Sequence, residues 1–117
     1  MLDNEINIAI EAAKASGKLL LENKNNLNKE TSNNSKDVKL EADVSSENLI
    51  KEIITSSSEY PILAEESGKS HEDLGELFWV IDPLDGTANY NRAIPICCVS
   101  IGLIHKMKPI AGVIYDF

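Results

Sequence analysis

The chain has 117 residues, of which 43% are hydrophobic and 26% charged, as in a folded domain rather than a disordered or low-complexity polymer. Its 11 basic and 19 acidic residues give a net charge of −8, which disfavours nucleic acid as a partner. No apolar run reaches the ~18 residues of a membrane span, and the acidic start does not resemble a secretory signal, so we expect a cytoplasmic protein with no membrane contact.

The N-terminal region predicts an amphipathic helix over residues 3–23. Its apolar side chains recur with the 3.6-residue period that places them on one helix face. The predicted members of this face are Ile6, Ala9, Ile10, Ala13, Gly17 and Leu20. The Asn-rich stretch 23–36 that follows is typical of an exposed loop.

A second helix is predicted to begin within residues 43–46 and to fade in the serine run 56–58. Its apolar stripe consists of Leu49, Ile50, Ile53 and Ile54. Four later segments predict strands, and they are 61–64, 77–81, 96–105 and 109–116. The run 77–81 is apolar throughout, which indicates a strand covered on both faces. The predicted fold class is α+β, with the N-terminal helices packed on a mainly antiparallel sheet.

Acidic residues follow two of the predicted strands where each strand ends. Glu65 and Glu66 follow 61–64, and Asp82 follows 77–81. If these strands are neighbours in one sheet, the carboxylates converge at its edge, where α/β proteins favour ligands. Such a cluster is tolerable when it is solvated, protonated or bound to cations, and Mg²⁺ prefers such oxygen ligands. A Glu-Glu pair taken alone is more often a solvated surface feature.

The segment D-P-L-D-G-T at 82–87 adds features that suit a phosphate. Gly86 permits a positive φ or a close backbone approach. A helix starting at Gly86 or Thr87 would present free N–H groups to an anion, and the Thr87 hydroxyl could contact an attacking water. Metals beside such a helix end would form a phosphoryl-transfer site. An Asp-Gly pair taken alone indicates only a turn.

Two other motif classes compete for this segment. An EF-hand loop requires Glu at its twelfth position, but the twelfth residue from Asp82 is Ala93, so this interpretation fails. Phosphatases of the haloacid dehalogenase class place one residue between two acids, the first of which is the nucleophile. Here two residues separate Asp82 from Asp85, and this class remains the alternative.

Three segments together resemble the inositol monophosphatase family. They are A-E-E-S at 64–67, W-V-I-D-P-L-D-G-T-A-N-Y at 79–90 and I-P-I-C-C-V-S-I-G-L at 94–103. The resemblance implies a Mg²⁺-dependent, lithium-sensitive phosphatase related to fructose-1,6-bisphosphatase and the bisphosphate nucleotidases. It also implies that the sheet and helices are the first part of an αβαβα sandwich, that the full-length form is a homodimer, and that the substrate is an inositol monophosphate.

The resemblance also implies roles for individual residues. Metal ligands would be the carboxylates of Glu65, Asp82 and Asp85 and the carbonyl of Leu84, while Glu66 would bind metal-linked water. The implied reaction is in-line attack by metal-activated water, without a phosphoenzyme.

The implied phosphate site uses the backbone N–H groups of Gly86 and Thr87. Asp43 would pair with Thr87 to orient the nucleophilic water, so Asp43, Glu66 and Thr87 are the candidate catalytic residues. The chain departs from the family pattern in having Ala64 before the Glu pair and Leu40 where Thr is usual.

The length of the chain also departs from the family pattern. Members of this family are longer, and a late Asp in their second half completes the metal site. We therefore expect residues 1–117 to be the N-terminal portion of such a domain, with the C-terminal portion absent. A metal-binding or interaction fragment without turnover remains a further alternative.

Overall fold

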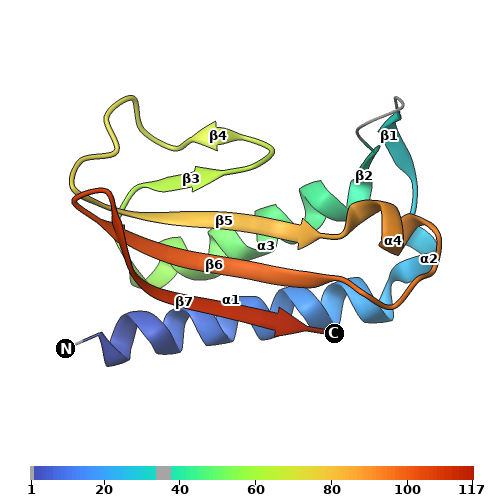
Figure 1. Ribbon diagram of the computed structural model, residues 1–117, viewed down its shortest axis with the longest axis horizontal. Coiled ribbons are helices and arrows are strands. Elements are labelled where there is room, and N and C mark those ends of the chain that lie inside the picture. The colour runs from blue at the N-terminus through green and yellow to red at the C-terminus, as the bar shows by residue number, and fades with distance from the viewer. Residues whose placement is uncertain (1, 34–37) are drawn as a thin grey trace.

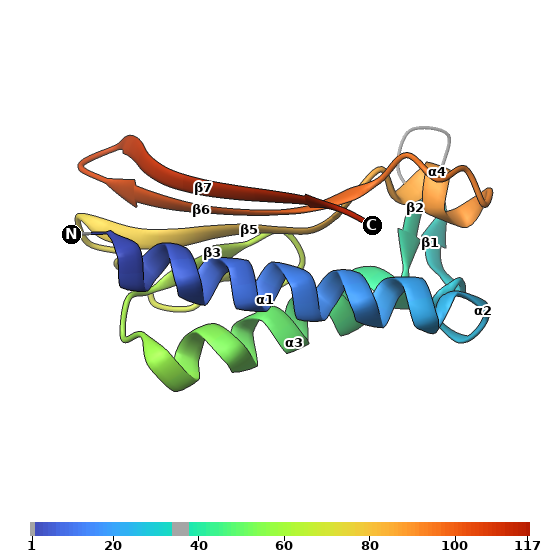
Figure 2. The same ribbon diagram turned by 90° about the horizontal axis from the view of Figure 1, so that it is seen from below.

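The computed structural model describes residues 2–33 and 38–117, which form a helical layer against a sheet (Figures 1 and 2). Two long helices, α1 (Asp3–Glu22) and α3 (Glu41–Ser57), cover the same face of the sheet. The strands are β3 (Ile62–Ala64), β4 (Gly68–Lys69), β5 (Leu77–Asp85), β6 (Cys98–His105) and β7 (Lys108–Asp116). No helix in the described part of the chain is long and apolar enough to cross a membrane.

The five strands follow the order β4-β3-β5-β6-β7. The β3–β5 pair is parallel and the other three pairs are antiparallel, which confirms the mainly antiparallel sheet. Strand β4 lies between the predicted strands 61–64 and 77–81 and was not itself predicted. A three-residue turn joins it to β3, and Gly68 after the turn has a φ of +76°, as in the common three-residue hairpins.

The expected loop over 23–36 is wrong for the residues that the structure describes there. A short helix, α2 (Lys24–Leu27), is followed by β1 (Glu30–Asn33), which pairs antiparallel with β2 (Val38–Leu40). The last part of that prediction, 34–36, lies outside the described residues. The periodicity of apolar residues did not reveal this hairpin because its sequence is mostly polar.

The core lies between the helical layer and the sheet. Trp79 is only 1% exposed, and its indole N–H donates a 3.1 Å hydrogen bond to the Ser58 hydroxyl at the end of α3. Phe78, on the opposite face of β5, is also buried, so the prediction that this strand is covered on both faces is confirmed at these two residues.

The buried face of α1 includes Ala9, Ala13, Gly17 and Leu20, as predicted, but it is rotated slightly from the predicted face. Ile10 is 36% exposed, whereas Ile8 and Ala12 are buried. Small residues let this helix approach its neighbours closely: a Cβ on Gly17 would lie 2.5 Å from the ring of Tyr115 on β7. The face is therefore chosen by side-chain size as well as by hydrophobicity.

Candidate functional site

The parallel strands β3 and β5 bring the predicted acidic residues to one edge. Ala64 pairs with Ile81, so Glu65 and Asp82 are the next residues along neighbouring strands. Figure 1 shows both strand arrows pointing toward α4 (Thr87–Asn91). The predicted convergence of these strand ends is therefore present, although β5 continues to Asp85 instead of ending at Ile81.

A β-bulge in β5 decides how the two Asp residues of D-P-L-D are oriented. Residues three apart on a regular strand point to opposite faces. Here Asp82 pairs with Ser100 and Asp85 pairs with Cys98, so β5 has one residue more than β6 in this interval. Ser100 and Cys98 share a face of β6, and the bulge therefore turns both Asp residues to that same face. Pro83 suits this place because a bulge tolerates a residue without an N–H group.

A cavity of about 240 Å³ lies at this end of the sheet. Its lining residues are Asp85, Gly86, Asn89, Ile96 and Cys97, with Cys98 of β6 and Asp116 of β7. The Cys98 thiol is 3.7 Å from Oδ2 of Asp85, and Asp116 pairs with Cys98 from β7. Burial raises the pKa of the Cys98 thiol, and the negative charges of Asp85 and Asp116 raise it further. The thiol is therefore held in its neutral form, and a nucleophilic role for it is disfavoured.

The donor set fits a hard cation. Oδ1 of Asp82 is buried and has no hydrogen-bond partner among the described residues. A buried carboxylate oxygen without a partner is costly, and a bound cation would offset that cost. No three His, Cys, Asp or Glu side chains within 2–33 and 38–117 form a ready-made metal cluster. The acids on the β3–β4 turn and on the β5 bulge therefore lie at one edge without closing into a complete site.

Gly86 joins the bulge to α4 in a conformation that requires glycine. Its φ is +94°, and a Cβ there would lie 2.8 Å from the carbonyl oxygen of Ile96. The turn places the first residue of α4, Thr87, directly after the acidic segment. The first N–H groups of a helix have no acceptor within it, and the predicted phosphate contact at Gly86 and Thr87 requires such free donors.

Asp43 connects α3 to this turn. It is 1% exposed, and its Oδ1 accepts a 2.9 Å hydrogen bond from the Thr87 hydroxyl. Its Oδ2 accepts a 2.9 Å bond from the N–H of Leu40, which caps the start of α3. The same Thr87 hydroxyl lies 3.1 Å from the carbonyl oxygen of Leu84. The structure therefore brings together the two residues that the resemblance pairs.

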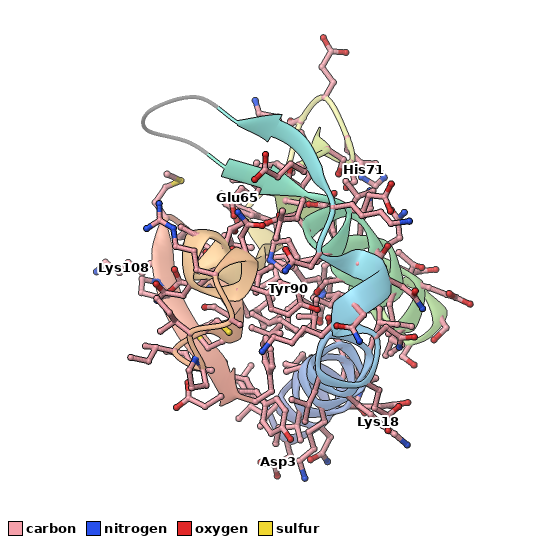
Figure 3. The ribbon with its side chains drawn as sticks, turned by 90° about the vertical axis from the view of Figure 1, so that its right-hand side faces the viewer. Asp3, Lys18, Glu65, His71, Tyr90 and Lys108 are labelled. Carbon is pink, nitrogen blue, oxygen red and sulfur yellow. The ribbon has the colours of Figure 1, made fainter. Side chains whose placement is uncertain are left out.

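Figure 3 looks onto this end of the molecule, where Glu65 lies on the α4 side and Tyr90 lies between α4 and α2. Tyr90 is 1% exposed, and its hydroxyl donates a 2.6 Å hydrogen bond to the carbonyl of Leu20 in α1. Its ring packs edge-on against Phe117, with 6.3 Å between the ring centroids. Tyr90 thus fixes α4 to the helical layer.

Two residues at this site were missed by the sequence analysis. Ser46 donates a 2.7 Å hydrogen bond to the carbonyl of Pro83, and the Glu47 carboxylate accepts bonds from the N–H groups of Glu66 and Ser67. The available signal was their spacing, because residues three and four positions after Asp43 lie on the same helix face.

Comparison with known proteins places the chain in a family. The model of the inositol monophosphatase family matches residues 1–117. A fructose-1,6-bisphosphatase/inositol-1-monophosphatase of Aquifex aeolicus is 38% identical over 97% of this chain and 44% of its own length. A Nus factor SuhB of Xylella fastidiosa is 39% identical over 95% of this chain and 41% of its own length.

A solved structure gives the same result. The inositol monophosphatase of Anabaena (Nostoc) sp. PCC 7120 superposes with a TM-score of 0.80 and 42% sequence identity, over 98% of this chain and 40% of that one. The chain thus spans less than half the length of each of these relatives.

Proposed function

The chain belongs to the inositol monophosphatase family, and from this premise we propose that the protein is a Mg²⁺-dependent phosphatase acting on a small phosphomonoester. The observation that carries the proposal is the β5 bulge, which turns Asp82 and Asp85 to one face. An oxygen of Asp82 is buried there without a hydrogen-bond partner in the described part of the chain. The match over the whole chain argues against the haloacid dehalogenase alternative, and with it against Asp82 as a nucleophile.

The metal would be held at the edge where β3 and β5 meet. Its ligands would be the carboxylates of Glu65, Asp82 and Asp85 and the carbonyl of Leu84. When bound, Mg²⁺ neutralises charge on the phosphate and lowers the pKa of a coordinated water. Glu66 would accept a hydrogen bond from water at the same edge, because it follows Glu65 on the turn.

The phosphate would be held at the start of α4. The backbone N–H groups of Gly86 and Thr87 would donate to its oxygens, and their positions are fixed by the turn at Gly86. This contact would orient the phosphorus toward the carboxylate edge.

The Thr87 hydroxyl would orient the attacking water. The hydroxyl has one proton, and Oδ1 of Asp43 at 2.9 Å accepts it. Its oxygen lone pairs are then available to accept a hydrogen bond from water, so a lone pair of that water would face the phosphorus. Asp43 is buried, which lets it hold this arrangement without competition from solvent. The leaving alcohol departs on the side opposite the attacking water, without a phosphoenzyme.

Three finer points belong to the same proposal. The sequence D-G-T-A-N-Y at 85–90 resembles the inositol monophosphatase branch of the family, so we propose an inositol monophosphate as the substrate. We also propose that the full-length form is a homodimer and that it acts in the cytoplasm.

The test is phosphate release by the purified full-length protein from inositol 1-phosphate, with fructose 1,6-bisphosphate and adenosine 3′,5′-bisphosphate as competing substrates. We expect turnover that rises with Mg²⁺ and is highest on inositol 1-phosphate. Preference for one of the other two substrates would contradict the proposed substrate but not the proposed phosphatase activity. Mg²⁺ binding without turnover on any of the three would contradict the proposal and favour the non-catalytic alternative.

A further inference from the structure

Helix α3 presents a row of buried polar side chains toward the candidate site. Most buried side chains in the described residues are apolar, and the buried polar or charged ones are Ser16, Asp43, Ser46 and Glu47. Three of these four lie on α3 with the i, i+3, i+4 spacing of a single helix face. A buried polar side chain is retained only when its hydrogen bonds are satisfied, so the partners of this row indicate its purpose.

Each member of the row contacts a different segment of the candidate site. Asp43 accepts the hydroxyl of Thr87, at the start of α4. Ser46 donates to the carbonyl of Pro83, inside the β5 bulge, and also contacts the hydroxyl of Ser16 on α1. Glu47 accepts from the turn between β3 and β4. One helix therefore holds three segments of the candidate site relative to one another.

Glu47 holds the β3–β4 turn with a buried carboxylate. Its side chain is only 2% exposed, and its two carboxylate oxygens accept separate hydrogen bonds, from the N–H of Glu66 at 2.8 Å and of Ser67 at 3.0 Å. Hydrogen bonds to a carboxylate are stronger than neutral ones, and two of them define the orientation of a turn. The next turn of α3 adds a third contact, because Lys51 Nζ lies 2.9 Å from the Ser67 hydroxyl.

We propose that Glu47 is a positioning residue for the metal ligands on the β3–β4 turn. This inference rests on the proposed function, because Glu65 is the ligand whose backbone would be held in place. The turn has only three residues, so fixing the N–H groups of Glu66 and Ser67 also fixes the direction in which Glu65 leaves β3. The Glu47 carboxylate is also repelled by the negative charges of Glu65 and Glu66. The hydrogen bonds that it accepts from the turn offset this repulsion.

Gln at position 47 would differ from Glu in the number of hydrogen bonds that it can accept from the turn. A Gln side chain has the same shape but one acceptor oxygen, and its NH₂ group would face the second N–H instead of accepting from it. Glu47→Gln should therefore release one side of the turn without creating a cavity. Residues that orient metal ligands in this way typically change metal affinity by about 10–100-fold when mutated.

The experiment compares the full-length protein with Glu47→Gln and with Glu52→Gln as the matched control. Glu52 is an exposed residue on the same helix, so its substitution makes the same chemical change without touching the turn. Binding of Mn²⁺ and Mg²⁺ is measured by calorimetry. Hydrogen exchange of the amides of Glu66 and Ser67 is measured by NMR in the absence of metal.

We expect Glu47→Gln to weaken metal binding about 10–100-fold and to speed exchange at the two turn amides while other amides keep their protection. Glu52→Gln should change neither. Equal metal affinity in the folded Glu47→Gln variant would overturn the inference, as would a uniform loss of protection, which indicates a purely structural role.

If this variant does not fold, Glu47→Asp, which keeps the charge but shortens the side chain, takes its place. Unchanged affinity in Glu47→Asp, or its failure to fold, overturns the inference as well.

Failure of the proposed function has a different signature. A wild-type protein that neither binds metal nor releases phosphate would remove the proposed function, and this inference with it. A wild-type protein that does both, alongside a Glu47→Gln variant of unchanged affinity, would remove this inference alone.

Discussion

The hydroxyl of Thr87 lies 2.9 Å from Oδ1 of Asp43, although 44 positions separate the two residues in the chain. The contact joins the first residue of α4 to the first turn of α3, and the other oxygen of the carboxylate is occupied by the N–H of Leu40. A single buried Asp therefore caps one helix and orients the hydroxyl at the start of another. Because Asp43 makes both contacts with one side chain, a substitution of Thr87 tests the proposed catalytic role without removing the cap of α3.

The first prediction concerns the Thr87 hydroxyl. Thr87→Ala in the full-length protein should lower kcat by about 10²–10⁴-fold, the usual contribution of general-base positioning of the attacking water, while KM changes little. Thr87→Ser keeps the hydroxyl and should recover most of the activity. Steady-state phosphate release measures both constants, and Thr55→Ala, at an exposed Thr on α3, is the control. A raised KM with unchanged kcat would instead make Thr87 a ground-state binding residue.

The second prediction concerns the buried oxygen of Asp82. Asp82→Asn replaces one carboxylate oxygen by an NH₂ group, which cannot coordinate a cation, so Mg²⁺ affinity should fall at least about tenfold. Calorimetry with Mg²⁺ measures the change. Asp73→Asn removes the same charge at an exposed residue between β4 and β5 and should leave the affinity unchanged. Equal affinities in wild type and Asp82→Asn would rule out Asp82 as a ligand.

The strand ends were predictable from sequence because apolar runs and the acids after them are local signals. The face of the sheet to which the side chains of Asp82 and Asp85 point was not predictable. The two residues share a face only because the bulge adds a residue to β5. A bulge depends on the pairing with β6, and pairing is a long-range property.

The site residues on α3 show a similar limit. Asp43 was found through a family motif, whereas Glu47 has no motif and was missed. The proposed role of Glu47 depends on hydrogen bonds from a turn about 20 residues later in the chain. No sequence pattern links a helix residue to the backbone N–H groups of such a turn. Likewise Ile10 fits the periodicity of α1 but is exposed, because contact with α3 and the sheet selects a slightly rotated face.

The third prediction separates steric crowding from backbone strain at Gly86. Gly86 and Gly75 both have positive φ, of +94° and +70°, but a Cβ on Gly75 would meet nothing within 4 Å. Gly75→Ala should therefore cost about 1–2 kcal/mol of unfolding free energy from strain alone. Gly86→Ala should cost about 1–3 kcal/mol more, because its Cβ would also press on the Ile96 carbonyl. Urea denaturation of both variants measures the difference, and equal losses would contradict the close approach.

The fourth prediction concerns the buried hydroxyl of Tyr90. The Leu20 carbonyl that accepts its hydrogen bond belongs to the last turn of α1, where carbonyls have no partner within the helix. Tyr90→Phe leaves this carbonyl without that donor and should lower the unfolding free energy by about 1–3 kcal/mol near neutral pH. Urea denaturation at pH 8 measures the loss, with Tyr60→Phe, at a less buried Tyr, as the comparison.

The same substitution predicts a change in alkaline stability. Burial raises the pKa of Tyr90 from 10.0 to about 12. Below pH 10 both the folded and the unfolded states keep the phenol proton, and the contribution of the hydroxyl is complete. Between pH 10 and about 12 the unfolded state loses this proton first, so it binds fewer protons than the folded state and stability falls as pH rises. The difference in unfolding free energy between wild type and Tyr90→Phe should therefore shrink across this interval, while other titrating groups affect both proteins alike and cancel. A difference that stays constant from pH 8 to pH 12 would show that the Tyr90 phenol ionises at the same pH in both states, and hence that its hydroxyl is not held at the end of α1.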